Sequence, residues 1–298
     1  MSKIVTLSNE NITAKISSFG AEIISINAFG KERIWDGNPE FWTGHAPILF
    51  PFCGGLLDDE YVYDGKMYSN MPKHGFAKRC EFEVVSEEKT QATFLLEPSE
   101  EYSKVYPFDF KFRVSFKLTS DGVQVYYIVE NHSNKNMPYN VGCHEAYALD
   151  GEFEDFYLKF EGEEGKITCL EITNDALGKG YYDVPLEENG LKLWYPYFNK
   201  EAKITEDRLG SGSLIFDDIK CKRVTLNKKG EDEVSIYFND FKNLVVWTVP
   251  GAKFLAIEPW SGLPDLYDAD KIIEHKKSID ILPAGETKTF YHSITFIK

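Results

Sequence analysis

Apolar and polar residues alternate at every second position through much of the chain. From Phe108 to Leu118, apolar side chains interleave with charged or hydroxyl-bearing ones, which is the pattern of a strand with one buried face. Ser120-Asp121-Gly122 follows as a turn, and the alternation returns from Val123 to Val129. These two segments therefore predict an antiparallel hairpin.

The same alternation recurs elsewhere, whereas helical periodicity is weak. It predicts two further hairpins and a last strand: Phe82–Val85 with Ala92–Leu96, Val234–Phe238 with Leu244–Val249, and Lys288–Phe296. Only Ser99–Tyr106 is suited to one or two helical turns. Many short strands separated by turns predict an all-β fold, an antiparallel sandwich or barrel.

The composition agrees with a single large β domain. Of the 298 residues, 43% are hydrophobic and 15% are aromatic, and aromatic richness favours strands. All-β domains can reach roughly 250 residues or more, so one domain spanning residues 1–298 is the simplest organisation. Gly210-Ser211-Gly212-Ser213 is interpreted as a flexible loop within that domain.

Charge and cysteine content narrow the class of partner. The formal net charge of −15 argues against nucleic acid and anionic membrane surfaces, and it disfavours a phosphorylated substrate unless a local basic pocket offsets it. The five cysteines are widely spaced, which indicates reduced thiols in a cytoplasmic protein. No signal-peptide core and no apolar run of about 20 residues are found. We expect a soluble protein, either a monomer or a homodimer.

Glu258 is the first candidate for chemistry. Glu258 directly follows an apolar run from Phe254 to Ile257, and Pro259 is expected to end the strand directly after it. A buried carboxylate is costly to desolvate, so it serves either as a general base or as part of a buried salt bridge or a helix cap. Trp260 beside it is either a core residue or a flat apolar face for a sugar ring.

Two histidines lie among small residues in turn-like segments. His74 precedes Gly75, and His144 follows Gly142-Cys143. Histidine can donate a proton to a leaving oxygen near neutral pH, although a histidine near a turn is more often a structural hydrogen-bonding group. Together with Glu258 they form a candidate acid/base set. The other histidines are interpreted as structural or surface groups: His45 in a loop, His132 at a strand end, and His275 and His292 in polar surroundings.

Other chemistries have less support in the sequence. It contains no Gly-x-Ser-x-Gly nucleophile elbow and no phosphate-binding P-loop. A metal site built from His74, His144 and Glu258 stays open, as does a glycosidase pair of Glu258 and Asp265. Sequence spacing decides neither case, because it does not set the distances between these side chains.

Taken together, several segments resemble the aldose 1-epimerase (galactose mutarotase) superfamily, specifically its LacX-like branch. The resemblance covers nearly the whole chain, and its specificity comes from all the motifs occurring in the family's order. The matching segments are Phe19–Ile26, Ala46–Gly54, Lys73–Lys78, Val141–His144 and Ile257–Gly262.

The resemblance implies a large antiparallel β-sandwich of the galactose mutarotase-like type, with a sugar bound in an open cleft. It implies an isomerase that interconverts the α and β anomers of a free aldose and uses neither a metal nor an organic cofactor. By motif match, Glu258 is the base for the C1 hydroxyl, His144 is the acid for the ring oxygen, and His74 holds the sugar. The candidate substrate-binding residues are Trp260, Lys78, Phe52 and Asp217.

The chain departs from the family pattern at three places, one of which is Lys78, where the family's HGFAR motif has an arginine. Gly55 stands where many relatives carry a sugar-binding arginine, and Lys78 or Arg79 are the candidate substitutes, although a lysine cannot reproduce the bidentate fork. Glu145 follows His144 where a proline is commoner. Two alternatives therefore stay open: a non-catalytic carbohydrate-binding protein on the same fold, and a hexose-6-phosphate 1-epimerase, which the acidic charge disfavours.

Overall fold

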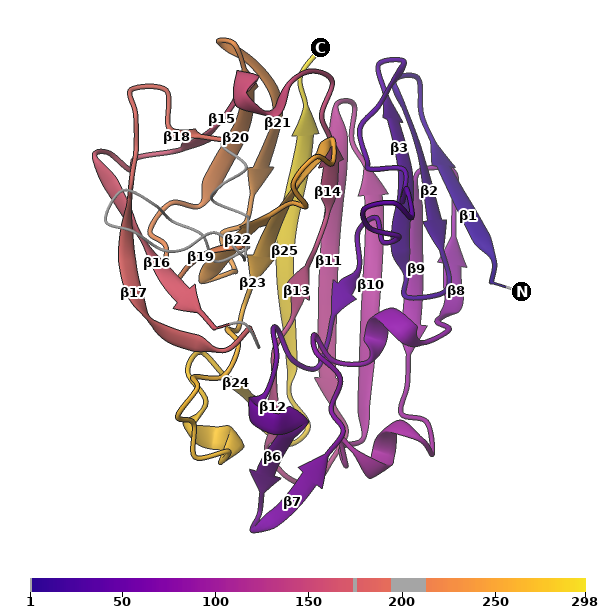
Figure 1. The fold of residues 1–298 in the computed structure, drawn as a ribbon. Helices are drawn as coiled ribbons and strands as arrows, with labels where there is room; N and C mark the ends of the chain where they lie inside the picture. The colour runs from indigo at the N-terminus through magenta and orange to yellow at the C-terminus, as the bar shows by residue number, and fades with distance from the viewer. Residues whose placement is uncertain (1, 174–175, 194–212) are drawn as a thin grey trace.

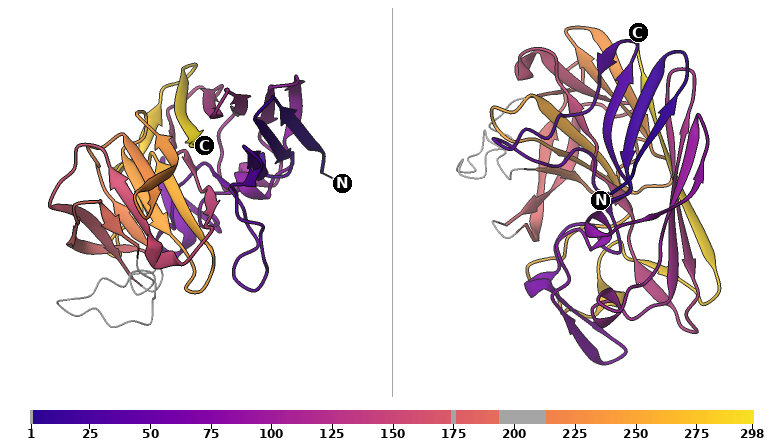
Figure 2. Two further views of the ribbon diagram at one scale, coloured as in Figure 1. Left: turned by 90° about the horizontal axis from the view of Figure 1, so that it is seen from above. Right: turned by 90° about the vertical axis from the view of Figure 1, so that its right-hand side faces the viewer.

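Two large antiparallel sheets form the framework of the protein, in a computed structural model that describes residues 2–173, 176–193 and 213–298 (Figure 1). Two further views show the layered arrangement from above and from the side (Figure 2). The predicted all-β antiparallel sandwich is confirmed. Of the loop expected at Gly210–Ser213, only Ser213 falls within the described residues.

The larger sheet has nine strands and carries the regular alternation seen in the sequence. β10 (Phe110–Leu118) and β11 (Gly122–Asn131) pair around the predicted turn. The predicted hairpin of β8 (Glu83–Glu87) with β9 (Gln91–Leu96) is also confirmed. The remaining strands of this sheet are β15 (Phe156–Phe160), β18 (Leu191–Lys192), β20 (Arg223–Lys228), β21 (Glu231–Tyr237) and β25 (Thr287–Phe296).

The second large sheet has eight strands. Its centre is β23 (Phe254–Trp260), which is buried along its whole length and pairs on one side with β22 (Asn243–Trp247). On the other side two short strands, β13 (Gly142–Cys143) and β14 (Ala146–Ala148), pair with β23 in succession. The remaining strands are β5 (Ile48–Leu49), β16 (Lys166–Ile172), β17 (Gly178–Pro185) and β19 (Leu214–Phe216).

The predicted hairpin of Val234–Phe238 with Leu244–Val249 is wrong. β21 lies in the nine-stranded sheet between β20 and β25, whereas β22 lies in the eight-stranded sheet between β19 and β23. Phe238 and Phe241 in the connection are completely buried, because the chain crosses through the core from one sheet to the other. Two apolar strands joined by a short turn look alike in sequence whether they pair or face each other across a sandwich.

Smaller elements complete the fold. One sheet has four strands: β1 (Ile4–Ser8), β2 (Ile12–Ser17), β3 (Glu22–Ala28) and β4 (Lys31–Glu32). Two sheets have two strands each: β6 (Glu60–Tyr63) pairs with β7 (Lys66–Ser69), and β12 (Met137–Tyr139) pairs with β24 (Asp280–Leu282). The described 3-10 helices are η1 (Leu57–Asp59), η2 (Ala77–Arg79), η3 (Tyr102–Lys104), η4 (Phe153–Asp155) and η6 (Ile273–His275). η3 falls within the segment predicted to form helical turns. Within the described ranges, no helix has the length and apolar character needed to cross a membrane.

The main hydrophobic core lies between the two large sheets. Phe50 and Phe112 stack in it with ring centroids 4.4 Å apart, and Phe160 meets Phe216 edge-on at 5.1 Å. Buried apolar area contributes about 25 cal/mol per Å², so these large rings are a major source of stability. Because side chains alternate between the faces of a strand, every second residue of β22 and β23 projects from the outer face of the eight-stranded sheet.

Candidate active site

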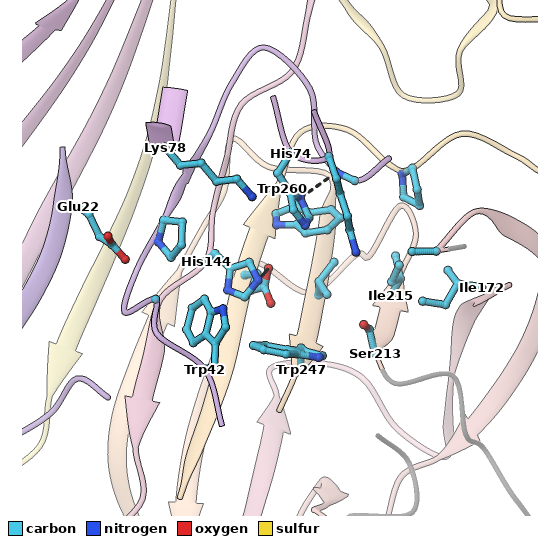
Figure 3. Close-up of a pocket in the computed structure, with 18 of the residues that line it drawn as sticks. Glu22, Trp42, His74, Lys78, His144, Ile172, Ser213, Ile215, Trp247 and Trp260 are labelled. Atoms are coloured by element: carbon cyan, nitrogen blue, oxygen red, sulfur yellow. Dashed lines mark hydrogen bonds and ion pairs between the residues drawn. The ribbon is translucent and has the colours of Figure 1, made fainter. Parts of the chain in front are cut away.

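The outer face of the eight-stranded sheet is hollowed into a cavity of about 530 Å³ (Figure 3). Its floor comes from three neighbouring strands: Ile215 of β19, Val245 and Trp247 of β22, and Glu258 and Trp260 of β23. A volume of this size is typical of a small-molecule site. The walls include Glu22, Trp42, Pro47, Gly54, Lys73, His74, Lys78, Arg79 and His144.

Glu258 lies in the floor of this cavity because of strand alternation. Leu255 and Ile257 enter the main core, so Ala256 and Glu258 project from the opposite face. Glu258 is only 1% exposed, and neither carboxylate oxygen has a hydrogen-bond partner among the described residues. A structural carboxylate at this depth is ordinarily paired. Glu258 instead faces the cavity and has Nε2 of His144 3.4 Å from its Oε2, which suits a group that acts on a ligand.

The strand continues through Pro259, where the sequence predicted that it would end. The backbone N–H of Ile257 donates to the carbonyl oxygen of Glu145. Hydrogen bonds of an antiparallel pair repeat every second residue, so the backbone N–H of residue 259 would be expected to donate to the carbonyl oxygen of Cys143. Proline has no N–H, and the indole Nε1–H of Trp260 donates to the Cys143 carbonyl oxygen at 3.2 Å. This hydrogen bond orients Trp260 at the cavity.

His144 lies opposite Glu258 on the neighbouring segment. Its Nε2 is 3.4 Å from Oε2 of Glu258. Directly opposed residues of antiparallel strands have Cβ atoms about 5 Å apart, which brings their side chains into contact. The register of β23 thus brings a candidate acid and a candidate base together. The pairs that set this register on either side are Gly142 with Trp260 and Ala146 with Ala256.

His74 enters the cavity from the loop before η2 in a left-handed conformation, with φ of 68°. Gly75 follows it, and no other residue fits there because a Cβ atom would lie 2.1 Å from the carbonyl oxygen of Phe50. The backbone N–H of Gly54 donates to Nδ1 of His74 at 3.1 Å. Burial lowers the pKa of His74 well below its usual value, so the ring is neutral. Its proton therefore sits on Nε2, which is a donor for a ligand.

Three tryptophans surround the two histidines (Figure 3). Trp42 stacks on the His144 ring with centroids 5.0 Å apart, and Trp247 meets the same ring edge-on at 5.4 Å. Trp260 meets His74 edge-on at 5.3 Å. Such rings provide large flat apolar surfaces beside polar groups, as a sugar requires for its C–H faces and hydroxyls.

Sequence reasoning missed Trp42, Trp247 and Lys73, all of which line the cavity. Trp247 carried a usable signal, because it lies on a strand that pairs directly with the strand of Glu258. Trp42 carried no local signal. It lies in a loop about a hundred residues before His144, and only the tertiary fold brings the two rings together.

Two predicted substrate-binding residues do not line the cavity and are corrected. Phe52 is 1% exposed in the main core, where it meets the ring of Tyr61 edge-on at 5.5 Å. Asp217 follows the end of β19, accepts a hydrogen bond from the Tyr181 hydroxyl at 2.6 Å and pairs with Lys277. Both lie near residues of the cavity in sequence, but the strand direction carries their side chains elsewhere.

Asp265 does not act as a second acid beside Glu258. Its Oδ1 lies 2.7 Å from Nζ of Lys276, and its Oδ2 accepts the backbone N–H of Leu57 at 3.0 Å. Asp265 and Lys276 form a buried ion pair and are not among the described residues that line the cavity. The glycosidase alternative therefore loses its second carboxylate.

Basic side chains gather at the cavity although the chain is acidic overall. Lys73, Lys78 and Arg79 all line it, and Figure 3 shows Lys78 extending toward His74 and Trp260. Burial, together with the positive charges of Arg79 and Lys73, lowers the pKa of Lys78 to about 8. Lys78 therefore lies at the cavity, and its predicted role in substrate binding stays a prediction.

Burial and neighbouring charges set the ionisation of the facing pair. Burial raises the pKa of Glu258 well above its usual value, Glu145 adds to this effect, and Lys73 and Lys78 oppose it. Burial lowers the pKa of His144 to about 3, and the same two lysines act in the same direction. The pair therefore holds one proton over a wide range of pH, and the glutamate is its favoured site.

Comparison with known proteins gives matches along most of the chain. A model of the family described as aldose 1-epimerase matches residues 3–267. The chromosomal and plasmid forms of Protein LacX from Lactococcus lactis subsp. lactis are each 32% identical to this chain over 306 residues, covering 96% of this chain and 97% of theirs.

Solved structures give the same picture. A galactose mutarotase related enzyme from Lactobacillus acidophilus is 31% identical, with a TM-score of 0.89, over 99% of this chain and 98% of that one. A galactose mutarotase-like protein from Lactobacillus casei ATCC 334 is 28% identical, with a TM-score of 0.87, over 99% of this chain and 100% of that one.

Proposed function

Because the chain belongs to the aldose 1-epimerase family, we propose that it interconverts the α and β anomers of an aldose by acid/base opening of the sugar ring. The observation that carries this proposal is the His144–Glu258 pair, 3.4 Å apart in a cavity lined by tryptophans. Mutarotation requires one proton removed and one delivered across the same hemiacetal, and no nucleophile. One acid/base pair beside apolar rings meets this requirement.

In the proposed reaction, the carboxylate of Glu258 removes the proton of the C1 hydroxyl while the C1–O5 bond breaks. The bond electrons go to O5, which takes a proton from the His144 imidazolium. The products are the open-chain aldehyde, a neutral Glu258 and a neutral His144. Rotation about C1–C2 presents the other face of the aldehyde, and the reverse steps close the ring as the other anomer.

The proposed cycle starts from the less populated ionisation of the pair, with a carboxylate on Glu258 and an imidazolium on His144. Ring opening moves one net proton from His144 to Glu258, and ring closure moves it back. The raised pKa of Glu258 and the lowered pKa of His144 favour the state reached after ring opening. The same preference is also the free-energy cost of forming the ionised starting pair from the resting one, so it does not by itself accelerate the reaction.

The other lining residues are proposed to hold the sugar. Nε2–H of His74 donates to the ring-oxygen region, and Lys78 donates to sugar hydroxyls in the role that an arginine has in many relatives. Trp260 and Trp247 pack against the C–H faces of the ring. In this arrangement the acid/base pair stays free to act on O1 and O5.

A second candidate substrate class is favoured by one observation. Lys73, Lys78 and Arg79 concentrate positive charge at the cavity of a chain whose net charge is −15. The overall charge therefore does not describe the field at this site. A hexose 6-phosphate is the alternative substrate that this local charge favours.

Polarimetry on fresh α-anomers tests both candidates. We expect the protein to accelerate relaxation of glucose or galactose at least about 10²-fold over buffer, with activity retained in chelator. A larger kcat/KM for glucose 6-phosphate, falling with added salt, would select the second candidate. Sugar binding by calorimetry without any acceleration would instead support a non-catalytic carbohydrate-binding protein. No binding and no acceleration across the panel would refute the proposal.

Restoring an arginine at Gly55 is expected to tighten binding of neutral sugars. No atom lies within 4 Å of a Cβ built on Gly55, its φ is outside the left-handed region, and its neighbour Gly54 lines the cavity. A guanidinium adds charge-assisted hydrogen bonds, so Gly55→Arg should lower KM about tenfold and change kcat little. Gly55→Met has similar reach and no charge. Equal KM values in the two variants, measured by mutarotation kinetics, would contradict this expectation.

A further inference from the structure

A second glutamate–histidine pair lies behind the candidate site, on the core side of the same sheet. Glu145 directly follows His144, and strand alternation turns it to the opposite face. It is 2% exposed, and its Oε1 lies 3.2 Å from Nε2 of His292 on β25 of the other sheet. His292 is completely buried, whereas the sequence placed it in polar surroundings. The expectation failed because residue 292 is one of the inward-facing positions of β25.

Stability alone does not account for this pair. A buried ion pair is on average no more stabilising than apolar side chains of the same volume, because both charges lose their hydration. The contact is also weak as a hydrogen bond: Oε2 of Glu145 and both ring nitrogens of His292 have no hydrogen-bond partner among the described residues. A core layer filled with aromatic rings would tolerate an apolar replacement, so the acid needs another explanation.

The backbone ties Glu145 closely to the acid/base pair. The N–H of Ile257 donates to the carbonyl oxygen of Glu145 at 3.1 Å. Glu145 is thus adjacent to His144 in its own segment, and it faces the residue that precedes Glu258 in the next strand. This ladder fixes the backbone of Glu145 behind the site, and its carboxylate lies buried beside His292.

We propose that Glu145, in contact with His292, is a positioning residue that keeps the working proton on the His144–Glu258 pair. The proposal rests on the proposed function, because only an acid/base reaction uses that proton. Lys73 and Lys78 on the cavity side are cations whose field favours loss of the proton, and Glu145 lies on the core side with the opposite charge. Consistent with this, Glu145 raises the pKa of Glu258 and the lysines lower it.

Titratable side chains surround the His144–Glu258 pair on both sides of the eight-stranded sheet. Those on the cavity side are mostly basic, and the carboxylate of Glu145 is the acid on the core side. The groups are Glu22, Lys73, His74, Lys78 and Arg79 in the cavity, and Tyr127, Cys143, Glu145, Tyr147 and His292 in the core.

The test is the pH profile of kcat/KM for mutarotation in two variants that break the same contact. Glu145→Gln removes the negative charge, so the pair loses its proton more easily, and the basic limb of the profile should move to lower pH. His292→Leu breaks the contact but keeps the acid, so its basic limb should stay at or above the wild-type position. If the contact had a purely structural role, the basic limb would shift in the same direction in both variants.

A readout without turnover separates this proposal from the proposed function. Titration of the Glu258 carboxyl by ¹³C NMR follows the same proton whether or not a sugar reacts. If wild type accelerates no sugar but Glu258 titrates at lower pH in Glu145→Gln, the proposed function fails and the role of Glu145 stands. Should Glu145→Gln not fold, Glu145→Met with His292→Leu supplies an apolar pair for the same comparison, with the same shift expected.

Two results would overturn the proposal. One is an identical Glu258 titration in wild type and in the variants that lack the Glu145 charge. The other is one equivalent of bound metal by elemental analysis that is lost in Glu145→Gln, because Cys143, Glu145 and His292 place one donor atom each within 4.8 Å of the others. In that case the trio is a metal site and not a charge held behind the pair.

Discussion

Replacing Glu258 with glutamine is expected to lower kcat for mutarotation by about 10³-fold, close to the buffer rate. Glutamine has nearly the same shape, but its amide cannot accept the proton of the C1 hydroxyl. Glu22 is the other carboxylate among the described lining residues, and its Oε1 already accepts the backbone N–H groups of His45 and Ala46. It is therefore not available as a substitute base. Polarimetry at saturating sugar measures the loss.

Thermal unfolding separates a catalytic from a structural role of Glu258. Because burial raises its pKa above the ordinary value of 4.5, the stability it contributes is full below that value and is lost as pH rises through the folded-state pKa. Glutamine does not titrate, so Glu258→Gln should be at least as stable as wild type at alkaline pH. Glu22→Gln keeps an acceptor and should retain the rate within a few-fold. A kcat of Glu258→Gln within tenfold of wild type would contradict the assignment.

The strands that alternate cleanly were predictable, and the way they assemble was not. β10 and β11 follow from local alternation around a tight turn, which is decided within about twenty residues. β21 and β22 have equally apolar sequences, but their pairing depends on which sheet each one completes. Proline usually ends a strand, yet β23 continues through Pro259, because the indole N–H of Trp260 supplies the donor that proline lacks.

The residues of the candidate site also fall into two groups, those that the sequence predicts and those that only the tertiary fold brings to the site. His74, His144 and Glu258 lie in motifs that sequence resemblance identifies, and the structure brings them to one cavity. The residues that set their environment come from elsewhere: Trp42 stacks from a distant loop, and Glu145 acts from behind the sheet. Contacts between segments far apart in sequence leave no local pattern, which is why sequence reasoning missed them.

Replacing His144 with asparagine is expected to lower kcat about 10²-fold and to change KM little. The variant removes the proton donor for O5, although water can partly replace it, so the loss is smaller than for Glu258→Gln. His144 contacts Glu258 and stacks on Trp42, so its role is in the reacting pair more than in holding the sugar. The pH profile should also lose the limb that depends on His144, because asparagine does not titrate.

His74→Asn is the matched control for this substitution. Asparagine tolerates the left-handed φ of 68°, and its Oδ1 can accept the N–H of Gly54 as Nδ1 of His74 does, so the loop is kept. The variant loses only the donor that holds the ring-oxygen region, and it should raise KM about tenfold with kcat nearly unchanged. A lower kcat in His144→Asn, together with a higher KM in His74→Asn, would assign proton transfer to His144 and binding to His74. The same split in both variants would mean that the two histidines do not have separate roles.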